Sequence, residues 1–483
     1  GDDAASELHP LAALPDLDGA RARLRALAAW AYLCACACAR FLSPLAWLRW
    51  LRSVVVSKPL ALLTSFLEGL TELLARHEEG EADLIGGIIR GAGYPYEQVE
   101  VTTADGYILT MDRLPNRGSR RVVYMQAGLL DSSVGWLTEN CVSSPALAAW
   151  DRGYDVWLGN FRGWAGARRH ADPAVRDTQW RYWNFSLDDH ALHDIPAFME
   201  RIHATKCAEL REAGALREEE LRPGAPRPYT VSVIAHSVGA AATLVYAVHE
   251  RTHERAVPVD HMVLCAPAGF HMDIPLSIWL ISLVFGNYLT APLVVRHISA
   301  VYIPSRVLRL LFRKVVHDLA HELDAVGELL GVVIGNVVFG GDASDWSLAA
   351  SKRDYLVARM PGISIQLLLQ LQQSLRTGRF EMRDYGRAEN LARYGSARPF
   401  DVGANYAALR GLPVDILAGT RDALTPAAMV RRHYELLLRA GVAASYQELD
   451  YGHLEFAIHV RDQFVGSLMA MMDAHAWQER TPD

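Results

Sequence analysis

The stretch Tyr229–Glu250, YTVSVIAHSVGAAATLVYAVHE, decides the fold. Its first six residues form an apolar, β-branched run typical of a buried strand, and the residues from Gly239 onward favour a helix. Between them, Ser237 lies in the segment AHSVG, Ala235–Gly239, with small neighbours. Small neighbours are needed where a serine occupies a sharp strand-to-helix turn, because larger side chains would collide with the adjacent strand and helix. The segment therefore predicts a strand, a tight turn that presents a nucleophile, and a helix.

Short apolar runs with the length of strands recur on both sides of this segment, and helical stretches separate most of them. This alternation predicts a mostly parallel sheet with helices on both faces. Residues 96–115 alternate apolar and polar side chains around Asp105 and Gly106, which indicates a hairpin. The apolar runs are 122–126, 155–161, 230–235, 262–266, 414–418 and 445–449.

The spacing of these runs is interrupted once, between Ala266 and Val414. An interval of this length exceeds an ordinary loop and predicts an inserted, mainly helical domain. The predicted parts are an N-terminal extension with apolar helices (1–90), an α/β core in two pieces (91–266 and 411–483) and a cap (267–410).

A serine nucleophile needs a base and an orienting acid, and in this type of fold the acid and then the histidine follow the serine along the chain. The run VDILAGTRD ends in Asp422 just after a predicted strand, and SYQELDYGH ends in His453 just after the next. The order Ser237, Asp422, His453 therefore predicts a catalytic triad.

Three other residues near these positions are less suitable. Asp415 lies at the start of its strand, and Asp450 is too near His453 in sequence to approach it from another loop. The side chain of His236, next to the serine, should point away from the site.

The oxyanion hole requires fixed backbone N–H groups that face the developing negative charge. In this type of fold one comes from the residue after the nucleophile and one from the loop after the third strand. Here these residues are Val238 and Leu129, which follows the run VVYMQ and Ala127-Gly128.

Composition excludes several classes of function. The 48 Lys and Arg residues against 55 Asp and Glu give a net charge of −7, which leaves no excess of positive charge for nucleic-acid binding. The six cysteines contain no CxxC pair, so neither zinc nor redox chemistry is indicated. His317 and His321 have the spacing of a zinc-binding helix, but the acid between them is Asp instead of the usual Glu, and we expect no metal site there.

Two apolar regions indicate contact with a lipid surface. Residues 26–39 carry no charge and lie among Trp30, Trp47, Trp50 and several arginines, which favours an interfacial helix over a helix that spans the bilayer. The alternative is an amphipathic arm that packs on the protein itself. In the predicted cap, residues 274–295 carry no charge and indicate an apolar lid over the site.

Several blocks in chain order resemble the acid lipase family of α/β-hydrolases, which includes gastric and lysosomal acid lipases and steryl ester hydrolases. They are YPYEQVEVTTADGYILTMDRLP (94–115), QAGLLDSSVGWL (126–137), GYDVWLGNFRGWAGARRH (153–170), YWNFSLDDHALHDIPAFM (182–199), MPGISIQLLLQLQQSLRTGRFEMRDYG (360–386) and DYGHLEFAIHV (450–460). Two departures are Ala235 in place of Gly and Ala127 in place of His.

The resemblance implies an α/β-hydrolase fold and hydrolysis of neutral lipid esters, triacylglycerols or steryl esters, with no metal or organic cofactor. The long apolar cap disfavours an esterase for small soluble esters. The alternative function is a catalytically silent subunit of a membrane complex. We expect the protein at the endoplasmic reticulum, a lipid droplet or another organelle membrane. We expect a lipid ester as its substrate and no nucleic-acid partner. A partner within a membrane complex is the alternative that goes with the silent subunit.

Overall fold

The computed structural model describes residues 83–129, 131–137, 144–164, 168–216, 218–222, 225–270, 300–301, 362–457 and 462–477. The chain divides into two compact units, residues 1–78 and 79–483, and every described residue belongs to the second. The predicted membrane arm and the greater part of the predicted cap, including His317 and His321, lie outside the described residues, so these assignments stay predictions.

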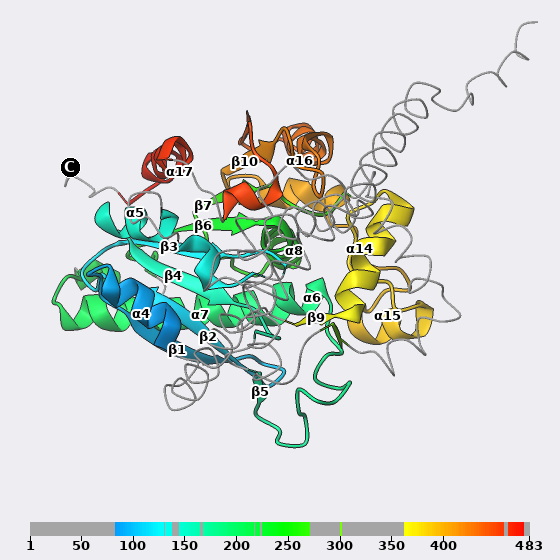
Figure 1. The fold of residues 1–483 in the computed structure, drawn as a ribbon, viewed down its shortest axis with the longest axis horizontal. Coiled ribbons are helices and arrows are strands. Elements are labelled where there is room, and N and C mark those ends of the chain that lie inside the picture. The colour runs from blue at the N-terminus through cyan, green and yellow to red at the C-terminus, as the bar shows by residue number, and fades with distance from the viewer. Residues whose placement is uncertain are drawn as a thin grey trace, which may run out of the picture. The chain divides into compact units, whose positions relative to one another are not determined.

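The described residues form a nine-stranded sheet with the order β1-β2-β4-β3-β6-β7-β10-β11, with β5 paired to β2 (Figure 1). Pairing is antiparallel where β2 meets β1, β4 and β5, and parallel from β4 through β11. The predicted α/β-hydrolase sheet is therefore confirmed. The strands are β1 (Glu97–Thr102), β2 (Tyr107–Leu114), β3 (Arg121–Gln126), β4 (Asp155–Asn160), β5 (Arg169–His170), β6 (Thr230–His236), β7 (His261–Cys265), β10 (Val414–Gly419) and β11 (Ala444–Leu449). A separate short pair joins β8 (Ala300–Val301) to β9 (Ile363–Ser364).

Helices cover both faces of the sheet because alternate strand residues are apolar on each side. One core cluster joins the sheet to α7 (Ile195–Glu212), α8 (Ser237–Thr252) and α16 (Ala427–Arg439). The other joins it to α4 (Asp83–Gly91), α5 (Pro145–Asp151) and α17 (Asp462–Ala474). Figure 1 shows α5 and α17 together on one side of the sheet and α7 and α8 on the other.

Further helical elements complete the described core. These are α6 (Leu187–Asp189), α14 (Ile365–Thr377), α15 (Arg387–Tyr394), a π-helix (His190–Asp194) and 3-10 helices at Ser133–Trp136, Glu218–Leu221, Gly403–Leu409 and His453–Phe456. Within the predicted cap, the longest described segment begins at residue 362. Ile363 and Leu367 in this segment belong to the same core cluster as α7 and α8. None of the helices within the described ranges is long and apolar enough to cross a bilayer.

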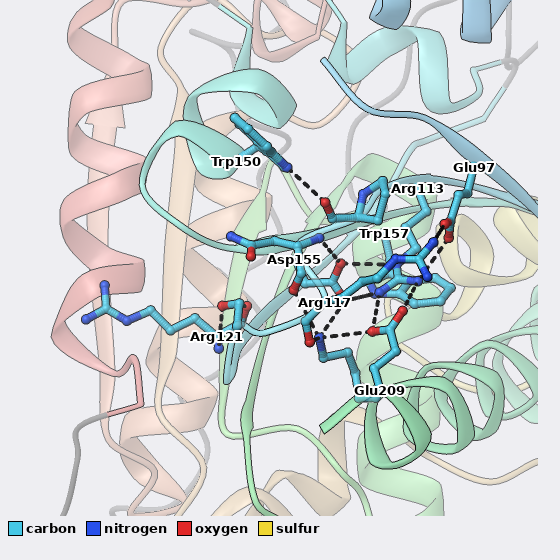
Figure 2. A network of polar contacts seen from close by, with 12 residues as sticks. Glu97, Arg113, Arg117, Arg121, Trp150, Asp155, Trp157 and Glu209 are labelled. Atoms are coloured by element: carbon cyan, nitrogen blue, oxygen red, sulfur yellow. Dashed lines mark hydrogen bonds and ion pairs between the residues drawn. The ribbon is translucent and has the colours of Figure 1, made fainter. Parts of the chain in front are cut away.

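A buried ion network fastens α7 to the antiparallel side of the sheet (Figure 2). The guanidinium of Arg113, on β2, donates two hydrogen bonds to Asp155 at 3.0 and 2.9 Å and two to Glu209 at 2.7 Å. Glu97 accepts another at 3.0 Å, and Lys206 adds a second buried cation 3.3 Å from Asp155. Arg113, Asp155 and Lys206 are essentially inaccessible to solvent. Since a buried charge is costly without partners, these residues fix how α7 docks on β2 and β4.

Candidate active site

Ser237 occupies the turn between β6 and α8, as predicted. Its φ of 54° lies in the left-handed region, which non-glycine residues rarely adopt. Such strain persists only where the surrounding structure holds it, and it is concentrated at functional sites. The turn brings Ser237 to the carboxyl edge of the sheet, and its side chain is nearly buried.

Close packing explains the small residues around the serine. A Cβ at Gly239 would lie 2.4 Å from the carbonyl oxygen of Ala127, and one at Gly128 would lie 2.9 Å from the Cβ of Ser237. Both distances are too short for real contacts, so these positions require glycine. Ala235, where the acid lipase family has Gly, is fully buried within β6.

The three predicted triad residues lie in hydrogen-bond contact. The Nε2 of His453 is 2.9 Å from the Oγ of Ser237, and its Nδ1 is 2.7 Å from the Oδ2 of Asp422. His453 begins a 3-10 helix after β11, and Asp422 lies on the loop after β10, so both come from the same sheet edge as Ser237. A hydroxyl bonded to an imidazole that a carboxylate orients is the arrangement that generates a serine nucleophile.

The loop around Asp422 holds its carboxylate in the ionised form. Its Oδ1 accepts hydrogen bonds from the N–H groups of Leu424 and Thr425 at 2.9 and 2.8 Å, and its Oδ2 accepts one from the Thr425 hydroxyl at 2.7 Å. Burial by itself would raise the pKa of Asp422, but the charge of His453 and these hydrogen bonds outweigh burial and lower the pKa below its ordinary value.

The two other acids that the sequence offered lie outside the triad, whereas His236, whose side chain was expected to point away, contacts the segment of His453. Asp415 bonds to His261 at the opposite edge of the sheet, and the side chain of Asp450 is 74% exposed. His236 is buried, and its Nε2 donates a hydrogen bond of 3.1 Å to the backbone carbonyl of His453. Burial, and then the charge of His453, lower the pKa of His236 to about 3. His236 is therefore neutral near pH 7 and supports the segment that carries His453.

Sequence reasoning missed a second support. Arg421, next to Asp422, donates to the side chain of Asp450 at 2.7 Å and to its carbonyl at 2.8 Å. It also donates to Glu455 at 3.1 Å, and Glu455 in turn accepts the N–H of Gly452 at 2.5 Å. These contacts bridge the loop that carries Asp422 to the loop that carries His453. In the sequence, Arg421 is marked only by its position beside Asp422. That position does not show whether its side chain joins two loops or simply faces solvent.

A small pocket adjoins Ser237 at the two residues predicted to form the oxyanion hole. Leu129 and Val238 both line it, and Val238 lies in the first turn of α8, where free N–H groups and the helix dipole favour negative charge. The remaining lining is mixed, with apolar side chains from Ile363 and Leu367. The other lining residues are Gln126, Gly128, Asp131, Phe161, Arg162, Phe185, His190, Gly362 and Ser364.

Arg162 and His190, which line this pocket, belong to a second ion network around the buried Asp194, and the sequence did not indicate it. Arg162 donates to Asp194 at 2.9 and 2.7 Å and to Asp105 at 2.7 and 3.0 Å. The Nδ1 of His190 lies 2.9 Å from Asp194, and its ring stacks on Phe161 with centroids 4.3 Å apart. Burial would raise the pKa of Asp194, but Arg162 and His190 lower it. The network therefore keeps Asp194 ionised beside the pocket.

Two groups of side chains within the described ranges are close enough to hold a metal ion: His261, Asp415 and His475, and Asp105, Asp189 and His193. Neither group contains Ser237, Asp422 or His453. The hydrogen-bonded serine, histidine and aspartate can carry out acyl transfer with their own side chains.

The chain is similar in sequence to known lipases. Residues 85–140 match the profile described as a partial alpha/beta-hydrolase lipase region. Gastric triacylglycerol lipase from Rattus norvegicus is 26% identical over 408 residues, which cover 79% of this chain and 89% of that protein. Lipase member K from Homo sapiens is 43% identical over 120 residues, 23% of this chain and 30% of that protein. A Crotalus adamanteus protein assigned the name lysosomal acid lipase/cholesteryl ester hydrolase is 32% identical over 192 residues, 37% of this chain and 45% of that protein. The chain is thus an α/β-hydrolase related to the gastric and lysosomal acid lipases.

Proposed function

We propose that the protein hydrolyses neutral lipid esters, triacylglycerols or steryl esters, with Ser237 as nucleophile, His453 as base and Asp422 as orienting acid. Its relatives are named lipases, so the chain is a carboxylic ester hydrolase. The observation that carries the proposed mechanism is the pair of hydrogen bonds of 2.9 and 2.7 Å that join the three side chains.

The reaction proceeds in two halves. The Nε2 of His453 takes the proton from Ser237 as its Oγ attacks the ester carbonyl, and Asp422 stabilises the imidazolium that forms. The N–H groups of Leu129 and Val238 bind the oxyanion. His453 then returns the proton to the alcohol, which leaves. Water attacks the acyl-serine by the same route and releases the acid.

A fluorophosphonate probe tests the nucleophile on the purified full chain. We expect one adduct, located on Ser237 by mass spectrometry and lost in Ser237→Ala. Ser232→Ala, a substitution of a buried serine on β6, the strand that leads into Ser237, is the matched control and should label normally. A folded protein that takes up no probe in detergent would refute the proposal and favour a catalytically silent subunit.

The substrate is tested next with the same preparations. Emulsified triacylglycerol and cholesteryl ester, each assayed for released fatty acid, distinguish the two substrate classes. Activity that survives in Ser237→Ala would place the chemistry on another residue.

We also propose that the enzyme works at a membrane or droplet surface, such as the endoplasmic reticulum, through residues 1–90 and the cap. The uncharged run 26–39 and its neighbouring tryptophans support this proposal. The full chain should float with lipid vesicles, and Trp47→Ser combined with Trp50→Ser should weaken flotation. Trp180→Ser is the control, because Trp180 is a surface tryptophan outside residues 1–90, 47% exposed. Flotation that depends equally on Trp180 would contradict the proposal.

A further inference from the structure

A histidine–aspartate–histidine cluster lies at the edge of the sheet opposite Ser237. His261 begins β7, Asp415 is the second residue of the parallel neighbour β10, and His475 follows the last residue of α17. One nitrogen from each imidazole and one carboxylate oxygen lie within 4.8 Å of one another. Three segments far apart in the sequence thus bring three metal-ligating side chains together, none of them used in the proposed reaction.

The cluster has the burial and the supporting contacts of a built site. His261 is fully buried, the side chain of Asp415 is 16% exposed and His475 is half-buried, which leaves one side accessible. The Nε2 of His261 lies 2.8 Å from the Oδ2 of Asp415, and the hydroxyl of Ser445 donates to the other oxygen. A partner of this kind orients a ligating carboxylate.

One polar atom of the cluster is unsatisfied. The Nδ1 of His261 is buried, and it has no hydrogen-bond partner among the residues that the structure describes. The Nε2 of the same ring is the nitrogen that faces Asp415, so an ion shared with Asp415 would take the place of the proton on Nε2. The rings of His261 and His475 lie 4.3 Å apart with an interplanar angle of 34°, so two imidazoles share one small space beside a carboxylate.

Two imidazoles and one carboxylate form the donor set that borderline divalent transition metals prefer, with a water completing a tetrahedron. The negative end of the α17 dipole lies at the same point and favours a cation. We propose that His261, Asp415 and His475 bind one such ion, of the Zn²⁺ class, which clamps the C-terminal end of α17 to β7 and β10. This site is separate from the proposed catalytic function.

The test is calorimetric titration of the chelator-treated full chain with Zn²⁺, together with thermal unfolding at each metal concentration. We expect one equivalent to bind and to raise the melting temperature. His475→Gln should weaken binding more than about 100-fold, beyond the roughly 10–100-fold cost of losing an outer hydrogen-bond partner of a metal ligand. It should also abolish the thermal shift. Asp415→Asn is the second variant and should weaken binding in the same direction.

The matched control is His253→Gln. His253 also stacks on a second histidine at the end of a helix, with the His249 ring 4.2 Å away, but the neighbouring Glu250 is bonded to Arg255. This variant should bind Zn²⁺ like the unmodified protein. Binding that is unchanged in His475→Gln, or lost in His253→Gln instead, would overturn the proposal. Fluorophosphonate labelling of Ser237 in each variant reports separately on the proposed active site.

Discussion

Substitution of His236 by Gln should make the protein more resistant to acid. His236 is buried next to Ser237, and its pKa falls from an ordinary 6.5 to about 3, first because of burial and then because of the charge of His453. As pH falls below 6.5, the unfolded chain binds a proton at this position and the folded protein does not. Stability from this group is therefore complete above about pH 6.5 and is lost progressively down to about pH 3.

The size of the effect follows from the two pKa values. Each pKa unit corresponds to about 1.4 kcal/mol. At about pH 4.5, the pH is about two units below the pKa of the histidine in the unfolded chain, while the histidine in the folded protein is still neutral. The free energy of unfolding is therefore about 3 kcal/mol lower than at pH 7. Glutamine does not titrate, and its amide can still donate to the carbonyl of His453. His236→Gln should therefore lose about 3 kcal/mol less free energy of unfolding than the unmodified protein between these pH values.

Denaturant unfolding of both proteins at about pH 7 and about pH 4.5 measures this double difference, in which other titrating groups cancel. His203→Gln, which removes an exposed histidine far from Ser237 in sequence, is the control for the substitution itself. If His236→Gln loses as much stability on acidification as the unmodified protein, His236 is not held neutral by burial and the reasoning fails.

Three further predictions concern the site. Asp422→Asn should lower kcat for a soluble ester about 10⁴-fold with little change in KM, because the amide leaves His453 in the wrong tautomer, whereas the exposed Asp450→Asn retains much more activity. Gly239→Ala should abolish fluorophosphonate labelling and lower the melting temperature, since the added Cβ would lie 2.4 Å from a carbonyl oxygen. Gly466→Ala in α17 is its control, because the added Cβ meets open space. This variant should stabilise the folded protein by about 0.5–1 kcal/mol. Arg421→Gln should lower kcat by about tenfold or more with KM unchanged, because displacement of the His453 loop by a fraction of an ångström disturbs proton transfer. The control is Arg431→Gln, which removes an exposed arginine. Equal activity of the two variants would contradict the role of Arg421 in joining the two loops.

Much of the sheet could be predicted because parallel strands buried on both faces are continuous apolar runs. The runs 122–126, 230–235 and 414–418 fall within β3, β6 and β10. The turn at Ser237 was predictable for a similar reason, since its steric demands select small residues at neighbouring positions. Strand order was not predictable in this way, because nothing local in β2 specifies that it pairs with β4 as well as β1.

The supports of the site were missed because they join segments that are distant in the chain. His236 reaches a carbonyl that is 217 residues away, and its type and position alone suggested a side chain that points elsewhere. Arg421 and Thr425 look like ordinary loop residues until the loops of β10 and β11 are placed side by side. Arg113 likewise has the character of a surface residue, yet it is almost completely buried.

That burial restricts how the sequence can drift over evolutionary time. Loss of Arg113 alone would leave Asp155 and Glu209 as buried anions short of a cation, at a cost of about 3–5 kcal/mol, which is a large part of the stability of a typical domain. Loss of Asp155 alone would remove a buried partner from both Arg113 and Lys206. A lineage can exchange the whole set for apolar residues at little net cost, but each single step toward that exchange is penalised. The residues of the network in Figure 2 should therefore be kept together or replaced together, and a relative that has replaced Arg113 should also have replaced Asp155.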